Sequence, residues 1–328
     1  MIELDGKKVL ITGGLGFIGS NLAKKFLSYG SKVTIFDCLD PRSGGNLYNV
    51  NEFKNSVNMQ YYDILNFDQL VHSVVDKDII VNCAASTSHP FSMKEPWIDL
   101  DVNSKGVINI LEAIRRFNKD VKFVHIGTTT QLGQTQYQPA DESHPEFPRD
   151  IYSANKSVSE KYVLVYAYAY GIKACVIRLS NVYGPRASIH SPEFTFNNYF
   201  IGLALQGKDI NVFGSGEQKR NLIYVDDVVN AIILASQSEK ANGETMFAVN
   251  DEHLSVAQIA RTISESLGPN NVNFVDWPIG KKSVDVGDAI ISNKKIKQLL
   301  GWSPKFDFIS GLEETKIFYK TCLNHYLR

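Results

Sequence analysis

Hydrophobic and polar residues alternate in blocks along the first half of the chain. Short apolar runs rich in β-branched residues are typical of buried strands, and longer stretches with apolar residues every three or four positions are typical of helices. The predicted strands are Lys8–Thr12, Lys32–Phe36, Asp78–Cys83, Val121–Ile126 and Lys173–Leu179. The predicted helices are Gly19–Tyr29, Val102–Phe117 and Ile151–Tyr170. Strands and helices in this alternation predict an α/β fold with a doubly wound parallel sheet.

The second half of the chain follows a different pattern. After about Asn181, glycine and proline become more frequent, the predicted helices are shorter, and aromatic residues gather in loops. We therefore expect residues 1–180 to form the parallel-sheet domain. Residues 181–328 are expected to form mainly a smaller α/β substrate lobe over the carboxyl edge of the sheet, with some segments returning to the first domain.

Composition narrows the class of protein. The chain has 328 residues, 44% of them hydrophobic, and a formal net charge of −1, so it carries no bulk field for nucleic acid or an anionic membrane. No apolar stretch is long enough to span a bilayer, and charges near the start interrupt the apolar run of a signal peptide. The four cysteines lie far apart without a CxxC pair, which predicts reduced thiols, a cytoplasmic location and no metal framework.

A glycine-rich turn follows the first predicted strand. Residues 12–19 read TGGLGFIG, in which glycines recur every third position from Gly13. This spacing permits a tight turn and a close approach of a pyrophosphate to backbone amides. Asp37 ends the second strand, where a carboxylate suits the ribose hydroxyls of NAD and repels the 2′-phosphate of NADP. Arg42 leaves NADP open, but the non-basic Cys38 follows Asp37, and the sequence favours NAD.

A tyrosine and a lysine share one face of the longest predicted helix. Residues 151–156 read IYSANK, so Tyr152 and Lys156 are four positions apart and lie on the same side. One interpretation is an ordinary surface pair. The other is a catalytic pair, in which the ammonium and a nicotinamide charge lower the pKa of the phenol. The phenolate would then take a proton from a substrate hydroxyl while hydride leaves the carbon.

Several motifs occur in a fixed order along the chain. They are TGGLGFIG, Asp37, Asp63–Ile64, NCAAS at 82–86, DVNSKG at 101–106, HIGTTTQLG at 125–133, YSANK at 152–156 and RLSNVYGPR at 178–186. Together they resemble the extended short-chain dehydrogenase/reductase family of NAD-dependent nucleotide-sugar epimerases and dehydratases, to which UDP-glucose 4-epimerase belongs. The resemblance runs from Lys8 to LGW at 300–302. It implies a Rossmann-type first domain, NAD as cofactor and a nucleoside-diphosphate sugar as substrate.

The resemblance implies roles for individual residues in the cofactor site. It places the pyrophosphate at the glycine turn, the adenosine at the ends of two strands and the nicotinamide beside the NCAAS segment. In that order, the residues are Gly13, Gly16, Phe17, Ile18, Asp37, Asp63, Ile64, Ala84, Ala85 and Ser86, with Asn103 ordering the site.

The resemblance also implies the catalytic residues. The catalytic hydroxyl of the family stands five residues before the glycine of its motif, and counting back from Gly133 gives Thr128. Tyr152 is then the acid/base, and Lys156 binds the nicotinamide ribose and tunes Tyr152.

Substrate residues are implied in the same way. Asn181 and Arg220 match positions that meet the diphosphate of the substrate, for which an arginine fork is well suited. Val212 and Phe213 are expected to wall the nucleotide pocket, with further lining from residues 196–200.

One segment departs from the family pattern. Many members carry a second diphosphate arginine in an Arg-Pro-Gly-Asp turn, where residues 285–288 of this chain read DVGD. Asp285 cannot hold a phosphate. Lys281 and Lys282 are near in sequence and could substitute as point charges.

The residues after Thr128 bear on the reaction. Dehydrating members of the family place an Asp–Glu pair there, and decarboxylating members keep a glutamate two positions on, whereas this chain has Thr129 and Thr130. Neither threonine is a general base at neutral pH. The simplest outcome is rotation of a transient keto-sugar and return of the hydride to its other face, which is epimerisation, most often at C4. A dehydratase, a C2-epimerase, a keto-sugar reductase and a non-catalytic NAD-binding regulator remain as alternatives.

Two features have more than one interpretation. The helix after Tyr152 is apolar nearly all round, which fits either packing against the sheet and lobe or a homodimer through helices 102–117 and 151–170. The dimer is common in the family and is the expectation here. His89, in the segment TSHPF, is either a sugar contact, a second base or a loop histidine with satisfied hydrogen bonds. No motif identifies the sugar or the nucleotide base.

Overall fold

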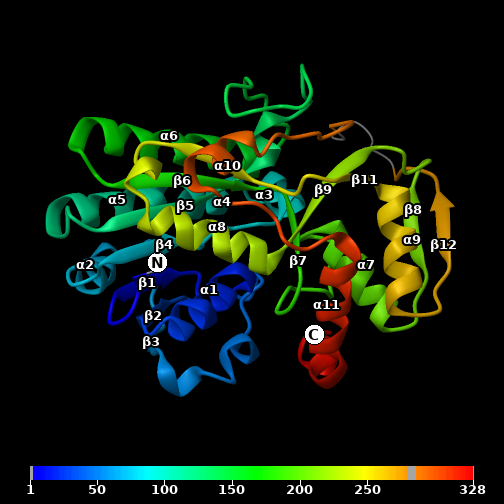
Figure 1. Cartoon of the computed structure of the whole chain (residues 1–328), viewed down its shortest axis with the longest axis horizontal. Helices are drawn as coiled ribbons and strands as arrows, with labels where there is room; N and C mark the ends of the chain where they lie inside the picture. Colours follow the sequence, from blue (N-terminus) through cyan, green and yellow to red (C-terminus); the bar gives the residue numbers. More distant parts are fainter. Residues whose placement is uncertain (1–2, 279–285, 328) are drawn as a thin grey trace.

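A seven-stranded parallel sheet forms the centre of the computed structural model, which describes residues 3–278 and 286–327 (Figure 1). The strand order is β10-β6-β5-β4-β1-β2-β3. The bounds are β1 Lys8–Thr12, β2 Lys32–Phe36, β3 Asn58–Gln60, β4 Ile79–Asn82, β5 Lys122–Thr128, β6 Ala174–Leu179 and β10 Thr245–Ala248. Each neighbouring pair is parallel, which confirms the predicted doubly wound sheet.

Helices cover both faces of this sheet. The bounds are α1 Phe17–Ser28 and α8 Val225–Gln237 on one face, and α2 Phe67–Val74, α5 Gly106–Phe117 and α6 Ile151–Tyr170 on the other. Each face of the sheet has its own hydrophobic core. In β1, Val9 and Ile11 belong to the core that includes α1 and α8, and Leu10 belongs to the core that includes α2, α5 and α6. Successive side chains of a strand point to opposite faces, so an uninterrupted apolar run is buried from both sides.

The second half of the chain builds a smaller lobe, seen at the right of Figure 1. It holds a three-stranded sheet of order β11-β9-β7 and a two-stranded sheet of β12 and β8. The bounds are β7 Asn181–Tyr183, α7 Phe196–Leu205, β8 Ile210–Phe213, β9 Lys219–Tyr224, β11 His253–Ser255, α9 Val256–Leu267, β12 Val272–Val275 and α11 Phe308–Cys322. β10 and α10 (Lys294–Leu300) return to the central sheet, where β10 pairs with β6.

Candidate active site

The carboxyl ends of the central strands open into a cavity of about 750 Å³, a size typical of small-molecule sites. Parallel strands all end at the same edge, so residues that are far apart in sequence meet there. Residues predicted for the cofactor and found in its lining are Gly13, Gly16, Phe17, Ile18, Asp37, Asp63, Ile64, Ala84, Ala85 and Ser86. The predicted catalytic residues Thr128, Tyr152 and Lys156 line the same cavity.

The glycine turn has no room for side chains. Gly13 has a φ of 67°, and a Cβ added there would lie 2.6 Å from the backbone nitrogen of Ala84. A Cβ on Gly19 would lie 2.3 Å from the carbonyl oxygen of Gly13. No side chain caps the N-terminus of α1, which begins directly after Gly16. The first amides of this helix therefore face the cavity as a cradle that suits a pyrophosphate.

Asp37 is held at the end of β2 by two backbone amides. Its Oδ1 accepts a hydrogen bond from Leu39 at 2.8 Å, and its Oδ2 accepts one from Leu15 at 3.0 Å. Burial raises the pKa of Asp37, and these two hydrogen bonds oppose the rise. Arg42 is held by Asp40 through contacts of 2.8 Å and 2.5 Å. A guanidinium already paired with a carboxylate is poorly placed to bind a 2′-phosphate, which fits NAD better than NADP.

An irregular helical turn positions Asn103. The segment predicted as one helix over 102–117 is preceded by α4 (Pro96–Leu100) and begins with a π-helical turn, Asp101–Lys105. Such turns are rare and occur frequently at functional sites. Asn103 accepts a hydrogen bond from the Ser86 amide at 3.1 Å and donates one to the Ser86 carbonyl at 2.8 Å. Asn103 is buried outside the cavity lining, and it holds the backbone of a residue that lines the cavity.

Tyr152 lies half-buried in the cavity wall at the first turn of α6. Burial, together with the nearby carboxylates of Asp99 and Asp150, raises the pKa of Tyr152. A hydrogen bond with Thr128 offsets only part of this rise. In the chain alone, burial and the two carboxylates therefore dominate the pKa of Tyr152, and the lowering expected from Lys156 together with a nicotinamide charge stays a prediction. Burial strips solvent from the phenolate, a cost that the sequence pattern does not reveal.

Lys156 is directed to the backbone of β5. Its Nζ donates to the carbonyl of Ile126 at 2.5 Å and lies 3.4 Å from Nε2 of His125. Burial lowers the pKa of Lys156 to about 8. Burial and the adjacent ammonium also lower the pKa of His125 well below its usual value, so the imidazole is neutral. Nδ1 of His125 lies 3.0 Å from the side-chain nitrogen of Asn82, whose oxygen accepts from Thr12 at 2.6 Å. A neutral imidazole can therefore lie beside the lysine without repelling it.

Two further hydroxyls belong to the Thr128 site. The side-chain oxygens of Thr128 and Thr130 lie 3.1 Å apart, and the Thr130 amide donates to Thr128 at 3.2 Å. Ser153 donates to the Thr130 hydroxyl at 2.9 Å. Sequence reasoning identified Thr128 but missed both partners. Their only sequence signal is position, since Ser153 directly follows Tyr152.

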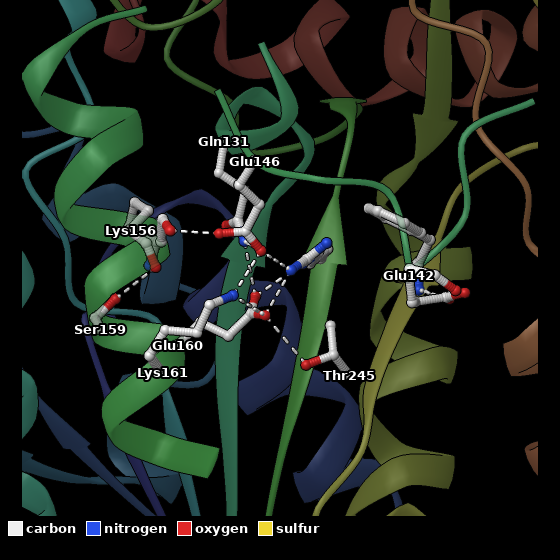
Figure 2. A network of polar contacts seen from close by, with 12 residues as sticks. Gln131, Glu142, Glu146, Lys156, Ser159, Glu160, Lys161 and Thr245 are labelled. Atoms are coloured by element: carbon white, nitrogen blue, oxygen red, sulfur yellow. Dashed lines mark hydrogen bonds and ion pairs between the residues drawn. The ribbon is translucent and has the colours of Figure 1, made fainter. Parts of the chain in front are cut away.

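A network of ion pairs and hydrogen bonds connects α6 with the turn after β5 and with β6 (Figure 2). Glu160, one helical turn after Lys156 on α6, accepts hydrogen bonds of 2.8 Å and 2.6 Å from Arg178 on β6. Arg178 also donates to Glu146 at 2.5 Å. Gln131, in the turn after β5, donates to Glu146 at 3.2 Å and to Glu160 at 3.1 Å. The network therefore ties the turn after β5 to α6 and to β6.

Two predicted substrate residues line the cavity from the lobe. Asn181 begins β7, and its side chain donates to the Asn221 carbonyl at 3.1 Å. Arg220 lies on β9 and donates to the Gly287 carbonyl at 2.5 Å. Both side chains are thus held at the wall, and their contact with a diphosphate stays a prediction.

Val212 and Phe213 do not line the cavity as described by the structure. Val212 is fully buried, and the Phe213 ring lies 5.8 Å from that of Trp277. The physical reason is that neighbouring residues of a strand point to opposite faces, so Val212 enters the hydrophobic core while Phe213 packs against Trp277. Phe196 and Ile291 contribute apolar wall instead.

The structure describes only part of residues 285–288, the segment that differs from the family pattern. Asp285, Lys281 and Lys282 lie outside the described residues. Val286, the next residue, lines the cavity. Within residues 3–278 and 286–327, no helix is long and apolar enough to cross a membrane, and no cluster of three or more potential metal ligands is found.

Comparisons with known proteins agree with this geometry. The chain matches the family model described as GDP-mannose 4,6 dehydratase over residues 10–315. A putative UDP-glucose 4-epimerase of Methanocaldococcus jannaschii is 31% identical over 306 residues, which cover 93% of this chain and 96% of that protein. UDP-glucuronic acid decarboxylase 1 of Xenopus tropicalis is 30% identical over 333 residues, which cover 98% of this chain and 74% of that protein.

A solved structure shows the same fold. The UDP-glucose 4-epimerase of Thermus thermophilus in complex with NAD aligns with a TM-score of 0.85 and 26% identity, covering 96% of this chain and 99% of that chain. An epimerase and a decarboxylase are similarly close relatives, so kinship alone leaves the specific reaction open. The chain belongs to the extended short-chain dehydrogenase/reductase family of NAD-dependent nucleotide-sugar epimerases and dehydratases.

Proposed function

We propose that this protein epimerises a nucleoside-diphosphate sugar at C4 with NAD that stays bound through the cycle. The glycine cradle, which a single Cβ would fill, and the anchored carboxylate of Asp37 fit the pyrophosphate and ribose of NAD. Bound in this cradle, NAD would supply the chemistry of taking up a hydride from the sugar carbon and giving it back.

Residues of this chain remove the proton of the sugar hydroxyl and give it back. Tyr152 takes the proton of the C4 hydroxyl, and Thr128, which hydrogen-bonds Tyr152, holds the same oxygen. Because burial raises the pKa of Tyr152, the phenolate depends on nearby positive charge to form at neutral pH. Lys156, one helical turn along α6, supplies a charge of this kind from this chain.

The observation that carries the proposal is the row of hydroxyls after β5. Thr129 and Thr130 line the cavity next to Thr128, and Thr130 is bonded to Thr128 and Ser153. A threonine hydroxyl does not remove a proton from carbon at neutral pH. The keto-sugar therefore meets no base from this turn, and rotation followed by return of the hydride is the reaction that these residues support.

A panel of nucleotide sugars tests the proposal. The purified protein is incubated with UDP-, dTDP-, GDP- and CDP-sugars without added cofactor and is followed by proton NMR. We expect one sugar to invert at C4, seen as a change in the couplings of H4, with no loss of water or carbon dioxide. The matched control is Tyr152→Phe, which should keep bound NAD and lose turnover by about 10²–10⁴-fold. A 6-deoxy-4-keto product or a pentose product would contradict the proposal.

A further inference from the structure

A histidine and an aspartate meet in the cavity wall beside Tyr152. His89 begins α3 (His89–Lys94), Asp150 is the N-cap of α6, and both line the cavity. Nδ1 of His89 lies 2.7 Å from Oδ2 of Asp150. The other oxygen of Asp150 accepts a hydrogen bond from the Ser153 amide at 2.7 Å. The carboxylate is therefore fixed by the catalytic helix and in turn fixes the imidazole.

This contact decides which ring nitrogen of His89 carries a hydrogen. Burial raises the pKa of Asp150, but hydrogen bonds from His89 and Ser153 outweigh it and hold the pKa below its usual value. An ionised carboxylate only accepts hydrogen bonds, so Nδ1 is the donor and the neutral ring has its lone pair on Nε2. No hydrogen bond from Nε2 occurs within the described ranges 3–278 and 286–327.

The His89 ring lies against the ring of Tyr152, the proposed acid/base, in the wall of the same cavity. The rings of His89 and Tyr152 are in edge-to-face contact, with centroids 4.6 Å apart and an angle of 67°. The His89 side chain is 36% exposed, so water can reach it. Because the His89 ring contacts the Tyr152 ring and both line one cavity with Thr128, a sugar held by Tyr152 and Thr128 would lie beside His89.

We infer that His89, positioned by Asp150, is a second acid/base that acts on a carbon next to the transient ketone. This inference rests on the proposed oxidation of the sugar. A C–H bond beside a ketone is acidic, because its electron pair can pass into the carbonyl. Nε2 takes that proton, the C–H bond breaks, and an enolate forms whose oxygen is hydrogen-bonded by Thr128 and Tyr152. Return of a proton from the imidazolium to the same carbon restores the ketone.

Proton transfer by His89 exchanges a carbon-bound hydrogen of the sugar with solvent, which C4 epimerisation by hydride transfer alone does not. A hydride that leaves and returns keeps every carbon-bound hydrogen, whereas the His89 step exchanges one hydrogen with solvent. The reaction is therefore run in D₂O with a nucleotide sugar that the wild-type protein converts, and if none is converted, with the whole panel. We expect deuterium at a ring carbon adjacent to C4, seen as a lost proton signal and a mass gain of one deuterium.

Three variants assign the exchange to the dyad. His89→Gln keeps a polar side chain but cannot take up a proton, and the ratio of exchange to C4 inversion should fall at least about tenfold. Asp150→Asn keeps an N-cap of similar strength but no longer orients Nδ1, and the ratio should fall as well. Asp150→Glu should restore part of it. The control is His72→Gln on α2, an exposed histidine outside the cavity lining, which should leave the ratio unchanged.

The outcomes separate this inference from the proposed function. Inversion without deuterium in the wild-type protein overturns the role of His89 and leaves the epimerase standing. Equal exchange in wild type and His89→Gln also overturns it. Exchange without inversion, lost in His89→Gln, supports the dyad and overturns C4 epimerisation. Neither inversion nor exchange with any sugar of the panel overturns both.

Discussion

Thr128 and Thr130 hydrogen-bond to each other through side-chain oxygens that lie 3.1 Å apart, and Ser153 on α6 donates to Thr130. This chain of hydroxyls holds the catalytic strand end against the catalytic helix. Thr130→Val removes the hydroxyl that makes these hydrogen bonds and keeps nearly the same side-chain shape. A hydrogen bond is worth about 1 kcal/mol net, so kcat should fall about fivefold with little change in KM. Steady-state kinetics test this, with Thr130→Ser as the control that retains kcat.

Lys156 predicts a pH dependence of stability. Its pKa is about 8 in the folded protein, against 10.5 for an ordinary lysine. Above pH 10.5 the amine is neutral in both states. As pH falls from 10.5 to about 8, the unfolded state binds the proton first, so the free energy of unfolding decreases, and below about pH 8 this loss is constant.

The experiment compares urea unfolding of wild type and Lys156→Met at pH 7, 9 and 10.5. Relative to this variant, the wild-type protein should gain stability as pH rises from about 8 to 10.5. The control is Lys105→Met, which removes a lysine whose side chain is 62% exposed. A difference between wild type and Lys156→Met that is independent of pH would show that the pKa of Lys156 is not lowered.

The Arg178–Glu160 pair predicts a large loss of stability. The two side chains are 2% and 1% exposed, so Arg178→Met leaves a buried carboxylate without its cation. Breaking a buried pair from one side costs about 3–5 kcal/mol. The matched control is Arg116→Met, which removes a partner of Glu112 whose side chain is 52% exposed and should cost under about 1 kcal/mol. Urea unfolding measures both, and equal small losses would mean that the network does not hold the site together.

The catalytic helix α6 predicts a homodimer. Val165 is 55% exposed and Tyr168 is 94% exposed, although the opposite side of the helix packs on the sheet. Exposed apolar side chains on an outer helix fit contact with a second copy through helices 102–117 and 151–170. Val165→Lys with Tyr168→Glu should halve the mass seen by light scattering. Ile317→Glu on α11, where Ile317 is 65% exposed, should leave the mass unchanged. A wild-type monomer would contradict the dimer.

Local patterns were sufficient for much of the molecule. The bounds of α6 were predicted because Asp150 caps its start and Gly171, with a φ of 69°, ends it, and both signals lie in adjacent residues. The glycine turn and the Tyr152–Lys156 spacing were equally readable, since each depends on one short segment. The start of α5 was less readable, because the π-helical turn before it serves a contact between Asn103 and Ser86.

The sequence by itself determined the parallel sheet, the family and its NAD cofactor, because periodicity, turn geometry and motif spacing are local properties. Only the tertiary structure brought His89 to Asp150, which are 61 positions apart, and packed Val212 inside the lobe instead of at the cavity. Burial in the folded chain and the nearby carboxylates of Asp99 and Asp150 also raise the pKa of Tyr152, which no local pattern indicates. The physical reason is common to all three, since distance, burial and desolvation depend on every element packed around a group and not on its neighbours in sequence.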